Sequence, residues 1–284
     1  MRDEKPSATA WRVALGRAAH QFLDTPTVFN DPLALRIVGA YEHGQTPESF
    51  FSERYKLSVR ATFLRAILAV RSRIAEDKLA AAVKRGVRQY VLLGAGLDTF
   101  GYRNPHVGVR VFEVDHPATQ AWKREILGRA GIPEPDSVTY VPVNFEQQTA
   151  LEGLSAAGFD RSAPAFFAWL GVTMYLQEDV VYAVLRDIAA LPSASGVTFD
   201  YAIAKSEMGL GTRLAVAAVN QRLKLIGEPW ITFFTPTALV TKLVALGFHD
   251  VLDLGSAELN MRYFGGRTDG LRVSSVAHVL TASV

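Results

Sequence analysis

The sequence contains no cysteine, which excludes disulfide bonds and thiolate metal sites. Its uninterrupted apolar runs are far shorter than the roughly 18 residues that a membrane-spanning helix needs. Residues 1–6 are polar and lack the apolar core of a secretory signal. These absences predict a cytoplasmic protein that neither crosses a membrane nor is secreted.

The charged residues are nearly balanced, with 30 Lys and Arg against 28 Asp and Glu, and no basic block stands out. We therefore expect neither nucleic acid nor an anionic membrane as a partner, which leaves a small molecule. A chain of 284 residues with 49% hydrophobic content can bury one large core, so a single domain is expected. No feature of the sequence indicates an oligomeric state.

A glycine-containing turn is the most informative stretch. The apolar run 89–93 leads into Gly94, Ala95 and Gly96, which is typical of a buried strand followed by a tight turn that a ligand can approach closely. Asp115 lies 21 residues beyond Gly94, at the end of the next predicted strand. An acid at this spacing is well placed to bind ribose hydroxyls, so the pair favours an adenosine-containing cofactor over a turn without a ligand.

The residues after the turn favour one cofactor over another. A dinucleotide-binding turn has a third glycine where this sequence has Thr99. Asp98 adds a negative charge that disfavours a diphosphate and is compatible with a cofactor that has no phosphate. The turn therefore favours S-adenosylmethionine (SAM), and a nicotinamide dinucleotide is the alternative.

Strands and helices are predicted to alternate along the chain, which indicates a doubly wound α/β fold with a mostly parallel sheet. The predicted strands are 89–93, 109–115, 138–143, 165–170, 195–201, 250–254 and 272–281. The predicted helices are 8–23, 33–38, 47–85, 118–130, 151–157, 178–190, 205–226 and 237–246. Ligands of such sheets bind at the carboxyl ends of the strands, where Gly94, Asp115, Asn144 and Leu170 are expected to lie.

We expect four parts within the single domain. They are an N-terminal helical part (1–86), a cofactor-binding core (87–204), an inserted helical lid (205–235) and a C-terminal part (236–284). The lid includes the aromatic residues Trp230, Phe233 and Phe234, which either contact an apolar small molecule or belong to the core.

Arg71 is unusual because it continues an apolar helical stripe. Leu57, Ala61, Leu64 and Leu68 recur at helical spacing, and Arg71 is next on the same face. An arginine there needs an anion, and the carboxylate of a bound methionine moiety would match its guanidinium. The alternative is that Arg71, or its neighbour Arg73, extends from the helix edge into solvent.

Three blocks resemble the leucine carboxyl methyltransferase family, and within it the bacterial branch described as polyketide-type O-methyltransferases. They are GAGLDT (94–99), FEVDHP (112–117) and GVTMYL (171–176), supported upstream by residues 70–73 and 86–89. The resemblance implies a class I SAM-dependent methyltransferase with a Rossmann-like, seven-stranded sheet whose last strand is antiparallel. The acceptor atom would be an oxygen, in a carboxylate or a hydroxyl group.

The resemblance also implies roles for single residues. Arg71 matches the arginine that binds the methionine carboxylate, the turn around Gly94 lies under the cofactor, and Asp115 matches the ribose-binding acid. Asn144, followed by Phe145, occupies a position near the adenine amino group that is usually an aspartate, and its amide oxygen can still accept a hydrogen bond. Leu170 departs from the pattern, since an acid that contacts the amino end of the cofactor commonly stands there.

The sequence identifies no catalytic base. A carboxylate acceptor needs none, whereas a hydroxyl usually benefits from one, and His20, His116, Tyr175 and Tyr201 are the candidates. No metal site is predicted, because the histidines lack ligand spacing and Glu113, Asp115 and His116 are better explained as a ribose site. Two alternatives to an O-methyltransferase remain: a SAM-binding protein without catalysis and a nicotinamide-dependent oxidoreductase.

Overall fold

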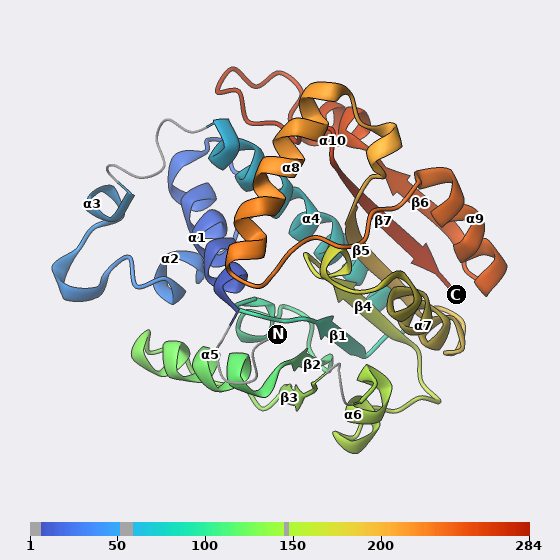
Figure 1. Ribbon diagram of the computed structural model, residues 1–284. Coiled ribbons are helices and arrows are strands. Elements are labelled where there is room, and N and C mark those ends of the chain that lie inside the picture. The colour runs from blue at the N-terminus through green and yellow to red at the C-terminus, as the bar shows by residue number, and fades with distance from the viewer. Residues whose placement is uncertain (1–6, 52–58, 145–147) are drawn as a thin grey trace.

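The fold is centred on a seven-stranded sheet with helices around it (Figure 1). The computed structural model describes residues 7–51, 59–144 and 148–284. The strands are β1 (Gln89–Leu93), β2 (Arg110–Asp115), β3 (Val138–Pro142), β4 (Ala165–Trp169), β5 (Gly196–Ala202), β6 (His249–Leu254) and β7 (Ala277–Ser283). Their order in the sheet is β3-β2-β1-β4-β5-β7-β6, and β7 is antiparallel to both of its neighbours. The predicted fold class is therefore confirmed, including the antiparallel last strand.

The central strands are covered on both faces. Every residue of β1, β4 and β5 is buried, which explains why these segments are almost continuously apolar. The chain order reverses between β1 and β4, because β2 and β3 lie on one side of β1 and β4 and β5 on the other. This reversal leaves a crevice at the carboxyl ends of the strands, where ligands of such sheets bind.

Helices form a layer on each face of the sheet (Figure 1). Side chains of α6 (Ala150–Ala156), α7 (Glu178–Ala189) and α9 (Pro236–Leu246) pack on one face. Side chains of α4 (Val59–Lys84) and α10 (Ser256–Tyr263) pack on the other. Further elements are α1 (Ala8–Leu23), α2 (Ala34–Ile37), α3 (Pro47–Phe51), α5 (Pro117–Arg129) and α8 (Leu210–Leu225), with short 3₁₀ turns at Glu42–Gly44, Phe100–Tyr102, Thr173–Tyr175 and Lys205–Glu207.

The predicted stripe on α4 is wrong at Leu64, which is 40% exposed, whereas Leu68 is buried. Leu57 lies outside the described residues. The helix has no single buried face because it lies between the sheet and α1. A Cβ atom added to Gly16 of α1 would approach Leu68 Cδ1 to 2.5 Å, so the two helices are in close contact.

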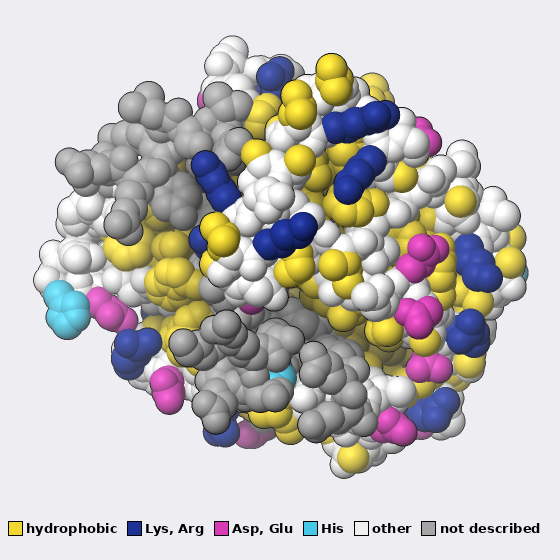
Figure 2. All heavy atoms as spheres, in the orientation of Figure 1, with side chains coloured by type: hydrophobic (Ala, Val, Ile, Leu, Met, Phe, Trp, Pro, Cys, Tyr) yellow, Lys and Arg dark blue, Asp and Glu magenta, His cyan; other side chains and the backbone are white. Residues whose placement is uncertain are grey.

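The segment predicted as a lid helix is interrupted. A 3₁₀ turn over Lys205–Glu207 precedes α8, and Gly209 adopts an extended conformation between them. Val216 and Leu223 are buried as expected, but Ile226 is 37% exposed. The outer face of α8 carries exposed leucines and basic side chains, which Figure 2 shows across the upper part of the molecule. The division of the chain into four parts, with 205–235 as a lid, stays a prediction.

Two predictions near the C-terminus are wrong. The last strand begins at Ala277 and not at residue 272, and α10 was not expected at all. Its eight residues bury little besides Leu259, so they carry almost no helical periodicity. In the part of the chain that the structure describes, no helix has the length and apolarity that crossing a bilayer requires.

Candidate functional site

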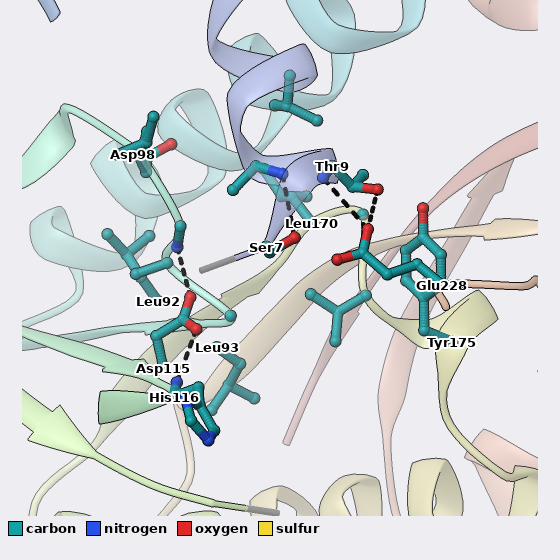
Figure 3. Close-up of a pocket in the computed structure, with 18 of the residues that line it drawn as sticks. Ser7, Thr9, Leu92, Leu93, Asp98, Asp115, His116, Leu170, Tyr175 and Glu228 are labelled. Atoms are coloured by element: carbon teal, nitrogen blue, oxygen red, sulfur yellow. Dashed lines mark hydrogen bonds between the residues drawn. The ribbon is translucent and has the colours of Figure 1, made fainter. Parts of the chain in front are cut away.

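A cavity of about 380 Å³ opens at the carboxyl ends of β1, β2 and β4. Figure 3 shows residues that line it, contributed by the sheet edge, by the start of α1 and by the loop after α8. Seven of the eight residues predicted to bind the cofactor line this cavity: Arg71, Gly94, Ala95, Gly96, Asp115, Asn144 and Leu170. The eighth, Phe145, lies outside the described residues. The structure therefore confirms that Gly94, Asp115, Asn144 and Leu170 lie together at one edge of the sheet. Their binding of a cofactor stays a prediction.

The glycine turn is held by backbone hydrogen bonds and by close packing. The amides of Gly94 and Ala95 donate to the Val114 carbonyl at 2.8 and 3.1 Å. Gly94 has a φ of +69°, and a Cβ atom there would lie 2.4 Å from Val172 Cγ2. The space beside Gly94 is therefore filled by Val172. The turn and this packing are enough to require glycine there, and the close approach of a ligand to Gly94, which lines the cavity, stays a prediction.

Asp115 is held at the end of β2 by the backbone around it. Its Oδ2 accepts the Gly96 amide and its Oδ1 the His116 amide, both at 2.6 Å. Burial raises the pKa of Asp115 and outweighs these two hydrogen bonds, which act in the opposite direction. Each carboxylate oxygen keeps a second acceptor position for a hydroxyl group.

Arg71 is buried at the cavity wall, so the interpretation that it extends into solvent is wrong. Its Nη1 donates to Asp200 Oδ2 at 2.8 Å, and Asp200 Oδ1 accepts the Gly171 amide at 2.6 Å. Gly171 has a φ of +76°, and a Cβ atom there would lie 2.8 Å from the Arg71 guanidinium. The exposed arginine is Arg73, which pairs with Asp77 on the surface.

Asp200 was not predicted as the partner of Arg71. The sequence of β5 does not indicate which residue the Asp200 side chain contacts. Its side chain is 3% exposed and its only described ion pair is with Arg71. Arg71 also lines the cavity, and only its Nη1 has a hydrogen bond among the described residues. Binding of a methionine carboxylate by Arg71 stays a prediction.

A second buried group of charges lies beneath the turn and was also missed. Arg17 of α1 donates from Nη1 to Asp98 and from Nη2 to Thr99 Oγ1, each at 2.9 Å, and also contacts Asp31. Burial raises the pKa of Asp98, but the Arg17 and Arg103 guanidiniums outweigh it and hold that pKa below its usual value. The negative charge predicted beside the turn is therefore present and is neutralised locally.

The four candidate bases divide into two pairs. His20 is fully buried against Asp24 and the amides of Val28 and Phe29, and the Tyr201 hydroxyl donates to Asp253 at 2.7 Å. Neither lines the cavity, so both are structural. His116 and Tyr175 do line it.

His116 and Tyr175 each have a structural constraint. His116 Nδ1 accepts the Ala118 amide as the N-cap of α5. Burial raises the pKa of Tyr175, which disfavours its phenolate.

Glu113 is not part of a ribose site, which corrects that prediction. It is fully buried and pairs with Lys123 of α5 at 2.6 Å, with Tyr102 also donating to it. Glu113 lies in the middle of β2 and faces α5, whereas Asp115 lies at the strand end, where the chain turns. The two acids share a strand but not a site.

Glu228 is a cavity residue that sequence reasoning missed. Its Oε2 accepts the Thr9 amide at 3.2 Å and also the Thr9 hydroxyl, so the start of α1 is joined to the loop after α8 (Figure 3). No cation lies within ion-pairing distance of Glu228 among the described residues. No sequence signal distinguishes this glutamate from other loop acids.

The aromatic residues of the same loop do not line the cavity. Phe234 is buried in the core, and Trp230 packs on Phe233 with 6.4 Å between ring centroids. The core interpretation of these rings is therefore correct, and the apolar cavity residues of this loop are Pro229 and Ile231.

Comparison with known proteins agrees with this geometry. The model of the leucine carboxyl methyltransferase family matches residues 10–189. The chain belongs to this family. YktD of Bacillus subtilis, named as a candidate SAM-dependent methyltransferase, is 29% identical over 99% of both chains. FRAAL3718 of Frankia alni, named likewise, is 35% identical over 72% of this chain and 69% of its own length.

Solved structures support the fold. A candidate methyltransferase from Thermobifida fusca superposes with a TM-score of 0.58 over 99% of this chain and 96% of its own, at 15% identity. A protein from Streptomyces avermitilis does so with a TM-score of 0.57 over 99% and 98%, at 14% identity. These structures bear on the fold alone, and the family suggested by the three sequence blocks is confirmed by the family match over residues 10–189.

Proposed function

We propose that this protein transfers the methyl group of SAM to an oxygen atom of a small molecule. Membership of the leucine carboxyl methyltransferase family, together with the names of its relatives, makes the chain a SAM-dependent methyltransferase. The acceptor oxygen and the small size of the acceptor are the parts that we propose.

The charge of the cavity supports SAM as the donor, on which the proposal depends. Two arginines line the cavity, and each is paired with a buried acid: Arg17 with Asp98 and Asp31, and Arg71 with Asp200. Asp115 and Glu228 also line it, and neither has an Arg or Lys partner among the described residues. A cavity with excess negative charge suits the sulfonium and ammonium groups of SAM and disfavours a diphosphate.

We assign the polar groups of the cavity to three parts of SAM. The remaining acceptor positions of Asp115 suit the ribose hydroxyls, and Asn144, which also lines the cavity, is assigned to the adenine. Arg71 offers the guanidinium nitrogens not bonded to Asp200 to the methionine carboxylate. Bound SAM supplies a methyl carbon activated by the sulfonium, and the protein must bring the acceptor oxygen to roughly 3 Å from it.

The size of the cavity supports a small acceptor. Its volume of about 380 Å³ is at the lower end of ligand pockets, which run from about 300 to 1,000 Å³. The start of α1 and the loop around Glu228 meet over it, so a protein chain has less access than a compact molecule.

One observation favours a second function, a SAM-binding protein without catalysis. Leu170 lines the cavity without a charge, so the ammonium group of the donor lacks an acidic side chain at that position. An oxidoreductase has less support, because its dinucleotide would bring a diphosphate to the acidic cavity.

Two measurements test the proposal. Calorimetry should detect binding of SAM and S-adenosylhomocysteine and none of NADH. Incubation with methyl-labelled SAM and a panel of carboxylates, phenols, amines and thiols should then label oxygen acceptors only. Esters and ethers are told apart because mild alkali releases the label from esters. Tight SAM binding without label in any acceptor would favour the non-catalytic function, and label only on nitrogen or sulfur would contradict the proposal.

A further inference from the structure

Within residues 7–51, 59–144 and 148–284, Glu228 has a partner on one carboxylate oxygen and none on the other. Both donors from Thr9, its backbone amide and its hydroxyl, bind Oε2. Figure 3 shows the carboxylate between Thr9 and the interior of the cavity, with its other oxygen pointing away from Thr9. Two donors on one oxygen fix the orientation of the carboxylate and leave Oε1 as an acceptor that faces the cavity.

This carboxylate lies apart from the groups suited to the donor. Asp115 and His116 are on the sheet-edge side of the cavity in Figure 3, and Glu228 is on the opposite side, beside Tyr175. Pro229 is the next residue in the chain, and Leu176 and Ile231 are further apolar residues that line the cavity. The wall that would face a methyl acceptor therefore combines apolar side chains with the phenol of Tyr175, the hydroxyl groups of Ser7 and Thr9, and one oriented carboxylate.

The charge of Glu228 discriminates between acceptor classes. An acceptor carboxylate would bring a second negative charge to this wall. Arg17 is already paired with Asp98 and Asp31, and Arg71 is paired with Asp200 and assigned to the methionine carboxylate, so neither is left for the acceptor. A neutral hydroxyl would instead donate a hydrogen bond to Oε1. Among hydroxyls, a phenol loses its proton to a carboxylate far more readily than an aliphatic alcohol does, and its ring suits the apolar surroundings.

On the basis of the proposed function, we infer that the acceptor is a neutral phenol and that Glu228 is the catalytic residue that takes its proton. The phenol O–H bond breaks and its proton passes to Glu228 Oε1. The oxygen forms a bond to the methyl carbon, and the carbon–sulfur bond breaks with its electron pair staying on sulfur. The products are a methyl ether, S-adenosylhomocysteine and a protonated Glu228 that returns its proton to water.

Matched probe molecules test the inference without knowledge of the natural acceptor. Two pairs share a ring skeleton and differ in the acceptor group: 2-naphthol with 2-naphthoate, and 4-phenylphenol with biphenyl-4-carboxylate. Binding of each to the full chain saturated with S-adenosylhomocysteine is measured by calorimetry. The wild type should bind at least one phenol tenfold or more tightly than its carboxylate partner, and Glu228→Gln should reduce this preference to under threefold.

Glu207→Gln is the matched control. Glu207 is exposed in the same insertion and does not line the cavity, so its removal changes the net charge equally and should leave the tenfold preference in place. Thr9→Val and Thr9→Ser provide a second pair of variants. Loss of the hydroxyl in the first frees the carboxylate to turn and should weaken the preference, whereas the second retains the donor.

Methyl transfer gives an independent readout. Labelled methyl incorporation into the bound phenol should fall at least 100-fold in Glu228→Gln while the affinity for S-adenosylhomocysteine stays within threefold, which shows that the variant is folded. The inference is overturned if no phenol binds, if the wild type prefers carboxylates, or if Glu228→Gln keeps the preference. Equal labelling of carboxylates by both proteins would overturn it and leave O-methyl transfer standing.

Discussion

The two walls of the cavity are held in different ways. The sheet-edge wall is fixed by short backbone hydrogen bonds to Asp115, by the turn at Gly94 and by the buried pair of Arg71 and Asp200. The opposite wall is fixed where Thr9 meets Glu228, between two partly exposed segments. The first wall is part of the folding core, whereas the second can separate at little cost to stability, as entry of a ligand into a covered cavity requires.

Removal of Asp200 should have the largest effect on the sheet-edge wall. Asp200→Ala leaves the Arg71 guanidinium buried without its partner, which should lower the free energy of unfolding by about 3–5 kcal/mol. Urea denaturation measures the change. Asp77→Ala removes a comparable pair with Arg73, whose side chains are 52% and 50% exposed, and should cost at most about 1 kcal/mol. Equal losses in the two variants would contradict the assignment.

A side chain at Gly94 should have the next largest effect. Gly94→Ala places a Cβ at positive φ and against Val172, so the free energy of unfolding should fall by about 1–3 kcal/mol. Adding Val172→Ala should recover the part due to the clash and not the part due to φ.

Gly128 of α5 provides the control for that substitution. A Cβ there would meet no atom within 4 Å, so Gly128→Ala should be neutral or stabilise the protein by up to about 1 kcal/mol. A loss of stability at Gly128 as large as at Gly94 would show that the turn geometry is not the cause.

The pH dependence of stability should reveal the buried Asp115. Because burial raises its pKa in the folded protein, the folded state holds this proton at a pH where the unfolded chain, with a pKa of about 4, has lost it. This contribution to stability therefore falls as pH rises above about 4, by at most about 1.4 kcal/mol per unit, until the folded pKa is passed. Urea denaturation of wild type and Asp115→Asn at several pH values measures it. The free energy of unfolding of the wild type minus that of the variant should fall with pH. A difference that rises with pH would contradict the prediction.

The opposite wall should respond least. Thr9→Val removes one hydrogen bond between partly buried groups, so the free energy of unfolding should fall by only about 0.5–1.5 kcal/mol. Thr9→Ser should be closer to wild type by the same measurement. A loss comparable to that of Asp200→Ala would show that both walls belong to one cooperative core.

The same contrast explains what the sequence could predict. Strand ends, the turn at Gly94 and the acid at Asp115 are local patterns, and strand order brings them to one edge whatever the details of packing. The partners of Arg71 and Arg17 were not predictable, because Asp200 and Asp98 are distant in sequence and meet them only after the helices pack. Arg17 gave one signal, since it lies between the buried Ala14 and Ala18 on the apolar side of its helix.

Apolar periodicity did not predict the buried face of a helix that is buried on two sides, or the presence of a helix that is hardly buried. α4 lies between the sheet and α1, so Leu64 marks no core face, and α10 is too exposed to show a stripe. Residues 227–234 look like a ligand-binding loop because they are aromatic, yet Phe234 packs into the core and Glu228 faces the cavity. Aromatic content alone does not distinguish a core contact from a binding contact.

The place of β7 between β5 and β6 has a consequence for folding. Ala277–Ser283 comes after both of its neighbours in chain order, and until it pairs with them β5 has an unpaired edge and β6 has no neighbour. A chain that has formed only the earlier strands therefore carries an open, aggregation-prone strand edge. Insertion of β7, more than any earlier event, is the step that closes this sheet.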